Sequence, residues 1–322
     1  MLKFINKKLA LQWIILIGLL ALSLHTVASK TILINDNGTF FLFKSFAQFF
    51  SRHIFLGKGI IIIVLLLQVI LLQFFFINND YVVKKSLLPA CFYLSILLIT
   101  KSLTIISPCF FTLLFFILLI SVDYDVSITC IKNSALWVGM FIALATGFDV
   151  CGLILLIIAI TALIINQFSK IKEIAILLFG FSLVYLFFFS YFFLTNHLSE
   201  WKWSFQEISV FGFFNSGITT PVFLLVSLLG LSVIYLYFII RIRIISESKV
   251  IKHRNKVFTF IIWSILMFSC LFVTNLTYPQ SLGYIIVPAS IYMSILTQEK
   301  NPFYINELVT LATFLIFVLL WG

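Results

Sequence analysis

The side chains that could support chemistry gather in two polar segments of an otherwise apolar chain. The first segment holds Asp36 within the turn-forming sequence Asn35-Asp36-Asn37-Gly38 and continues to Arg52, His53 and Lys58. A carboxylate can take a proton from an acceptor hydroxyl group, a histidine can assist the transfer, and cations can hold a phosphate. Asp is also common in turns and helix caps, so capping the helix that follows is a simpler role for Asp36.

The second segment is the loop 195–220, which contains His197, Glu200 and Glu207 between tryptophans. Its carboxylates and histidine would form a composite site with Asp36 if both segments face the same compartment. The alternative is a solvated loop that its tryptophans anchor at a membrane interface. From the two segments we predict that Asp36, His53 and Glu207 are catalytic. We predict that Arg52, Lys58 and His197 bind the substrate.

Motifs for metals and cofactors are weak or missing. Asp123-Tyr124-Asp125 imitates the DxD pair that holds a divalent ion in nucleotide-sugar transferases, but it stands alone in a short loop. The five cysteines are scattered singly, without the spacing of a zinc site. Phosphate-binding glycine loops, HExxH and GxSxG are not found either. The sequence therefore predicts neither a metal nor a cofactor.

Composition decides which kind of structure must position these residues. The chain has 322 residues, of which 62% are hydrophobic, 39 are phenylalanine and only 10% are charged. A soluble domain carries about 25% charged residues, so this chain cannot cover itself with a water-compatible surface. We predict an all-α polytopic membrane protein, with one transmembrane domain over 1–322 and the lipid bilayer as its partner.

Apolar runs of about 20 residues are long enough to cross the hydrocarbon core as helices. Two regions leave the count open, because 86–121 and 134–166 each fit a hairpin of two helices or one long helix. Two hairpins predict about eleven membrane-spanning helices, and two single helices predict nine. The eleven predicted ranges are 9–28, 59–77, 86–100, 102–121, 134–148, 150–166, 174–194, 221–240, 257–274, 282–297 and 306–321.

Basic residues choose between these alternatives, because lysine and arginine collect in cytoplasmic loops. Eleven helices with the N-terminus inside place fifteen of the 21 basic residues in the cytoplasm and six outside. Merging only 134–166 would move the basic loop 241–256 to the outside. We therefore predict an inner-membrane protein with a cytoplasmic N-terminus and a periplasmic C-terminus. Orientation then explains the formal charge of +10, and no nucleic-acid partner is predicted.

The segment 39–52 has the pattern of an amphipathic helix. Its polar positions recur at spacings of three and four, and phenylalanines fill the other face. We predict a helix in the membrane interface, with Phe43, Phe46 and Phe50 toward lipid and Lys44 and Gln48 toward water.

Asp149 interrupts the apolar run 134–166 and marks the tip of the predicted hairpin. At the surface it is a turn carboxylate. Below the surface, an ionisable group at membrane depth becomes a functional candidate.

The middle of the chain resembles an uncharacterised family of bacterial multi-pass inner-membrane proteins, known only as a domain of unknown function. The resemblance covers about residues 60–195 and lies in three stretches: Asn79-Asp80-Tyr81 to Leu98, Trp137-Val138-Gly139 to Leu163, and Lys172-Glu173-Ile174 to Phe193. Members tend to carry an aromatic-Pro turn in the hairpin, where this chain has Phe148-Asp149. The family brings no established activity.

The first outer loop, residues 29–58, also looks like that of the GT-C class of lipid-dependent glycosyltransferases. An acidic residue there is followed at once by an interfacial helix and then by many hydrophobic helices. The likeness implies that Asp36 is the base, that Arg52 or His53 meets the phosphate, and that the donor is a polyprenyl-phosphate-linked sugar. The alternative is a non-catalytic accessory or scaffold subunit with other membrane subunits as partners, and a transporter is the third hypothesis.

Overall fold

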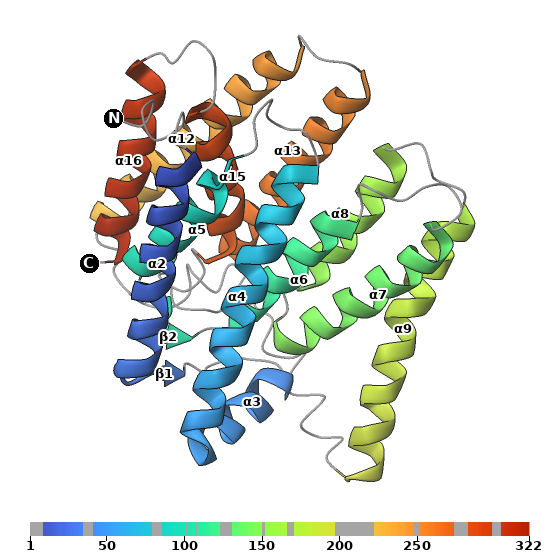
Figure 1. Ribbon diagram of the computed structural model, residues 1–322. Coiled ribbons are helices and arrows are strands. Elements are labelled where there is room, and N and C mark those ends of the chain that lie inside the picture. Colours follow the sequence, from blue (N-terminus) through green and yellow to red (C-terminus); the bar gives the residue numbers. More distant parts are fainter. Residues whose placement is uncertain are drawn as a thin grey trace.

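Long apolar runs become helices throughout the computed structural model (Figure 1). Its described part consists of twelve helices and one pair of two-residue strands, which confirms the all-α prediction. The structure describes residues 9–34, 41–78, 86–100, 102–106, 108–122, 131–149, 152–165, 171–196, 222–247, 251–273, 283–297 and 304–321.

Each of the eleven helix ranges expected from hydropathy coincides with a helix, and the amphipathic segment forms one more. In chain order the elements are α2 (Leu9–Ser29), β1 (Leu33–Ile34), α3 (Phe41–Arg52), α4 (Ile54–Asn78), α5 (Leu88–Ile99), β2 (Ile105–Ile106), α6 (Pro108–Val122), α7 (Ile131–Phe148), α8 (Gly152–Ile165), α9 (Ile171–Leu194), α12 (Val222–Glu247), α13 (Ile251–Val273), α15 (Gly283–Thr297) and α16 (Tyr304–Trp321).

Helix boundaries depart from the predictions where polar residues extend a helix. The predicted cytoplasmic loop 241–256 is largely helical, because α12 continues to Glu247 and α13 begins at Ile251. Arginine and lysine are good helix formers, so the helices run past the end of the apolar sequence.

Three helices in the described part are long and apolar enough to cross a membrane. They are α2, the section Ile54–Phe74 of α4, and α9. Several others are shorter: α5 has 12 residues, α8 has 14, and α6 and α15 have 15 each. At 1.5 Å per residue these helices fall below the roughly 30 Å of a hydrocarbon core.

Helix α15 is enclosed by other helices. All of its 15 residues are buried, from Gly283 to Thr297. It packs against α5, α6, α12, α13 and α16. A helix that is apolar all round and covered on every side belongs to the interior of a protein.

The region 86–121 forms two helices rather than one. The segment between α5 and α6 contains β2, which pairs in parallel with β1: Leu33 lies opposite Ile105, and Ile34 lies opposite Ile106. The second helix begins at Pro108, later than the predicted residue 102, because residues 102–106 form a turn and this strand. Proline favours the first position of a helix, where its missing N–H costs nothing.

The run 134–166 is also divided, as the charge distribution predicts. Helix α7 ends at Phe148, and α8 begins at Gly152. The backbone closes the turn with a hydrogen bond from the Gly152 N–H to the Asp149 carbonyl oxygen, 2.9 Å long. A Cβ atom at Gly152 would collide with the backbone of Thr146, so this turn requires a glycine.

Two buried glutamine side chains join helices of the first half. The Gln68 side chain in α4 donates to the Phe110 carbonyl oxygen of α6 over 2.6 Å, and its Oε1 accepts the Tyr93 hydroxyl of α5 over 2.7 Å. In α2, Gln12 Oε1 accepts the Leu87 N–H at the start of α5 over 2.9 Å. These bonds connect four helices through polar groups that have left water.

The second half uses the same kind of contact. Trp263 Nε1 in α13 donates to the Ile158 carbonyl oxygen of α8 over 3.2 Å. The Tyr237 hydroxyl of α12 donates to Asn306 Oδ1 of α16 over 2.7 Å. Hydrogen bonds between helices therefore supplement apolar packing on both sides of α15.

Helices α7 and α9 make the most extensive contact of the structure. On α7 the small residues Ala135, Gly139, Ala143 and Gly147 recur every four residues and are all buried. Gly139 lies so close to the Leu177 carbonyl of α9 that a Cβ atom would collide with it, and Gly180 meets the Leu136 carbonyl in the same way. Small residues allow two helix backbones to approach to this extent.

We expect Gly139→Ala to destabilise the protein, because α7 and α9 must move apart to admit a methyl group. Overpacking typically costs about 1–3 kcal/mol. Thermal unfolding in detergent measures the effect. The matched controls Gly18→Ala and Gly59→Ala add the same atom where no other atom lies within 4 Å. Within a helix they should leave stability unchanged or raise it by about 0.5–1 kcal/mol. Equal effects at all three positions would contradict the close contact.

Candidate functional site

One end of the bundle carries the first polar segment. Helix α3, the strands β1 and β2, the start of α4 and the C-terminal end of α9 lie together at the lower end of the view (Figure 1). Two described stretches stop at this end: one after β1, just before the segment with Asp36, and one after α9, just before His197. Asp36, His197 and Glu207 themselves lie outside the described residues, as do Asp123 and Asp125.

The aromatic face of α3 packs against the protein, not against lipid. Phe43 and Phe50 are buried, and Phe46 is partly buried. The Phe46 ring lies 4.8 Å from that of Phe111 in α6, and the Phe43 ring lies 6.1 Å from it. The expectation that these phenylalanines face lipid is wrong for Phe43 and Phe50, because α6 covers Phe43 and the Phe50 ring lies on Gly57 of α4. Lys44 and Gln48 are exposed, as predicted.

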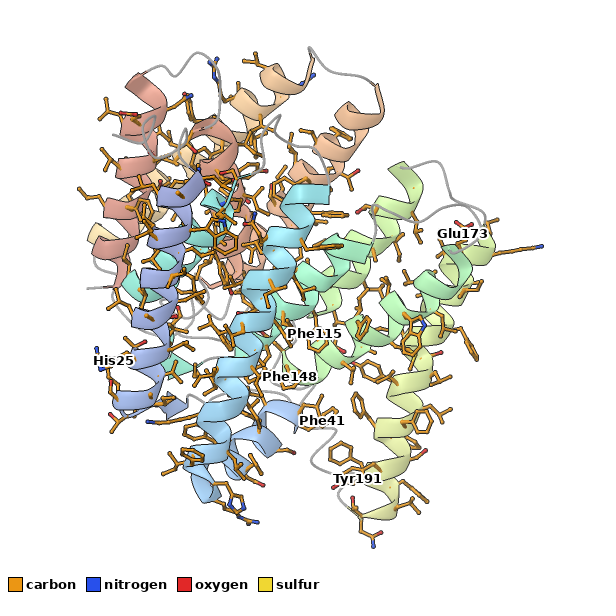
Figure 2. The ribbon with its side chains drawn as sticks, in the orientation of Figure 1. His25, Phe41, Phe115, Phe148, Glu173 and Tyr191 are labelled. Carbon is orange, nitrogen blue, oxygen red and sulfur yellow. The ribbon has the colours of Figure 1, made fainter. Side chains whose placement is uncertain are left out.

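The start of α3 is held by α7 and α9. Figure 2 labels Phe41 and Phe148 at this junction. The Phe41 ring makes edge contacts with Phe188 and Phe192 of α9, at centroid distances of 4.6 and 4.9 Å. Phe148 at the end of α7 stacks on Phe111 at 4.9 Å. Aromatic contacts of this kind fix the orientation of α3 relative to the bundle.

Residues 49–58 form the α3–α4 corner, where α3 ends and α4 begins. Arg52 and His53 are exposed there. The His53 ring lies 5.2 Å from the Phe49 ring, and the backbone N–H of His53 donates to the Phe49 carbonyl oxygen. The Phe50 ring rests on Gly57, where a Cβ atom would collide with it. The corner thus presents Arg52 and His53 from a backbone that packing holds in place.

Lys58 joins the corner to the end of α2. Its Nζ donates to the carbonyl oxygens of Ala28 and Lys30 at 2.7 and 3.0 Å. The last carbonyl groups of a helix have no partner within the helix and attract cations. The structure gives Lys58 a structural role, and its predicted role in substrate binding stays a prediction.

Asp149 is buried next to this end. The sequence alone left open whether this residue lies at the surface or below it. The side chain is only 6% exposed, and its Oδ2 atom is shielded from solvent. The preceding turn of α7 is tied to α9, because the Tyr185 hydroxyl donates to Thr146 Oγ1 over 2.7 Å. Leu42 of α3 rests on Gly147. By the criterion stated for an ionisable group below the surface, Asp149 joins the candidate site.

The described residues bring together cations at this end but no complete catalytic set. Within the described ranges there is no group of three or more His, Cys, Asp or Glu side chains that suits a metal ion. Asp149 is the only charged side chain among the buried residues of the described part. What the arrangement offers chemically is an exposed basic surface around Arg52, suited to a phosphate group.

No protein-family model, curated protein or solved structure matches this chain.

We expect Lys58→Met to lower stability by about 0.5–1 kcal/mol, because the α2 carbonyl groups lose their cation. The loss should shrink as salt is added, since salt screens exposed charges. Thermal unfolding at low and high ionic strength measures it. Lys44→Met, on the exposed face of α3, is the matched control and should have little effect. A loss of the same size in both variants would contradict the contact with α2.

Proposed function

We propose that the chain is a polytopic inner-membrane protein of about eleven spans with its N-terminus in the cytoplasm. A helix at every one of the predicted ranges supports this. The relative position of the segments supports it too, because residues before Asp36, the α3–α4 corner and the end of α9 lie at one end of the bundle. The charge pattern assigns all three to the outer side. Helices that are too short to cross the hydrocarbon core alone are compatible with a membrane protein where protein, not lipid, surrounds them.

Within that arrangement we propose a transferase that acts on a polyprenyl-phosphate-linked sugar. The observation that carries the proposal is the exposed Arg52–His53 pair, which lies at the same end of the bundle as the described residues before Asp36 and His197 (Figure 1). A donor anchored in the bilayer presents its sugar and phosphate at the height of such a surface. No separate soluble domain is needed to reach it.

The chemistry assigned to the residues is a single displacement. Asp36, assisted by His53 or Glu207, takes the proton of the acceptor hydroxyl group as its oxygen bonds to the anomeric carbon. The bond from that carbon to the phosphate oxygen breaks, and the phosphate leaves with the electron pair. Arg52, with Lys58 and His197, offsets the charge that develops on the phosphate.

An accessory or scaffold subunit is the second candidate. It is favoured by the interior, where α15 is covered on every side and buried polar side chains bond to neighbouring helices. Helix α9 is apolar and exposed along much of its length, which suits contact with lipid or another membrane subunit. A transporter is less well supported, because Asp149 is the one buried charge among the described residues.

Reporter fusions test the orientation. A reporter after Lys256 should behave as cytoplasmic, because it follows the most basic segment, and one after Gly322 should behave as external. A fusion after Asn196, at the α3 end of the bundle, should also be external. External activity after Lys256 would overturn the eleven-span arrangement.

Asp36→Asn tests the activity. The amide keeps the shape and the hydrogen-bonding capacity of the side chain but removes the base, so turnover should fall about 10²-fold or more. Complementation of a strain that lacks the gene, with abundance in the membrane measured in parallel, is the readout. Asp80→Asn makes the same change in a predicted cytoplasmic loop and should leave function intact. Full function of Asp36→Asn would favour the scaffold.

A further inference from the structure

The α3–α4 corner exposes large apolar side chains beside its cations. Phe55 is 89% exposed, and Ile54 and Leu56 are each 57% exposed. They lie within two helical turns of Arg52 and Lys58 along the chain. A soluble protein rarely leaves such a cluster uncovered. Apolar side chains next to cations are the arrangement that suits the boundary between acyl chains and headgroups.

Among the described residues at this end, every exposed charged side chain is basic. Lys30, Lys44 and Arg52 are exposed, and Lys58 is half-buried. The described carboxylate nearest in the fold, Asp149, is buried. The described part of this surface therefore offers cations to a partner, and anions are the partners that cations attract.

Orientation does not account for these cations. In the proposed topology four of the six basic residues outside the cytoplasm fall between residues 30 and 58. The bias that collects lysine and arginine in cytoplasmic loops would remove them from this side. Their concentration at one end of the bundle favours a local anionic partner.

We propose that the α3–α4 corner, together with the exposed face of α3 that carries Lys44, is a binding surface for a bilayer phospholipid with an anionic headgroup. Arg52 and Lys44 hold the headgroup phosphate, and Phe55, Ile54 and Leu56 lie against its acyl chains. The inference rests on the membrane placement proposed above. In the transferase, Arg52 would pass from this phospholipid to the donor phosphate, so the two lipids compete for it.

Chemistry favours a lipid over a free anion or an acidic peptide. A free phosphate makes no use of the exposed apolar side chains. An acidic peptide would need a groove or a sheet edge, and α3 and α4 present convex helical surfaces. A phospholipid uses both the cations and the apolar side chains at once. Each basic side chain near the surface raises the affinity for an anionic lipid about 5-fold.

Binding of phosphatidylglycerol to the full chain, purified in detergent and measured by native mass spectrometry, tests the proposal. The double variant Lys44→Gln/Arg52→Gln should bind it about 25-fold more weakly, from two side chains at about 5-fold each. Lys172→Gln removes an exposed cation at the other end of α9 and should bind as the unmodified chain does. Unfolding temperatures in phosphatidylcholine nanodiscs should be equal for all three, which establishes that the variants fold.

Two results would overturn the proposal. One is equal binding of phosphatidylglycerol by the double variant and the unmodified chain. The other is binding of glycerol phosphate, which lacks acyl chains, as tightly as the phospholipid. Failure of the membrane placement has a separate signature, because the chain would then leave the membrane fraction in alkaline carbonate.

Discussion

A polar group inside an apolar bundle must find its hydrogen-bond partner within the protein, and the fold depends on this constraint. The Gln68 side chain finds its partners by forming hydrogen bonds to α5 and α6 at once, and the Gln12 side chain accepts the Leu87 N–H at the start of α5. These two helices are short, so their ends fall within the bundle and their first N–H groups need partners there. The same bonds select neighbours among helices whose apolar surfaces are much alike. Lipid and leucine are equally apolar, so apolar contact alone would choose poorly.

Hydropathy and length were sufficient to locate the helices, because each apolar run ends where a charge, proline or glycine interrupts it. Both divisions were predicted from the distribution of basic residues, and both regions are divided in the structure, although the second helix of 86–121 begins at Pro108 and not at residue 102. The neighbour of each helix face could not be predicted. The spacing in α3 shows which face is apolar but does not distinguish lipid from α6 as its cover, since both are apolar. The contact between Phe46 and Phe111 joins residues 65 positions apart, and no local pattern records it.

For the candidate site, too, part could be predicted from the sequence and part could not. The residue types around Asp36 and Arg52 suggest phosphate chemistry without any structure. Three separate segments, α3, α7 and α9, meet at the turn of α7 that precedes the buried Asp149. The glycines on both sides, Gly147 and Gly152, were the available signal, because each marks a place where another part of the chain comes close. The bond from Lys58 to α2 crosses about thirty residues and likewise leaves no trace in local spacing.

The buried position of α15 has a consequence for biosynthesis. The helix occupies residues 283–297 and follows α5, α6, α12 and α13 in the chain, yet these earlier helices enclose it. While the ribosome is still making the earlier helices, the faces of α5 and α6 that later meet α15 have no permanent cover. Those faces stay without it until α15 itself has been made. A stop codon between α13 and α15 would therefore produce a chain in which α5, α6, α12 and α13 lack the helix that they enclose.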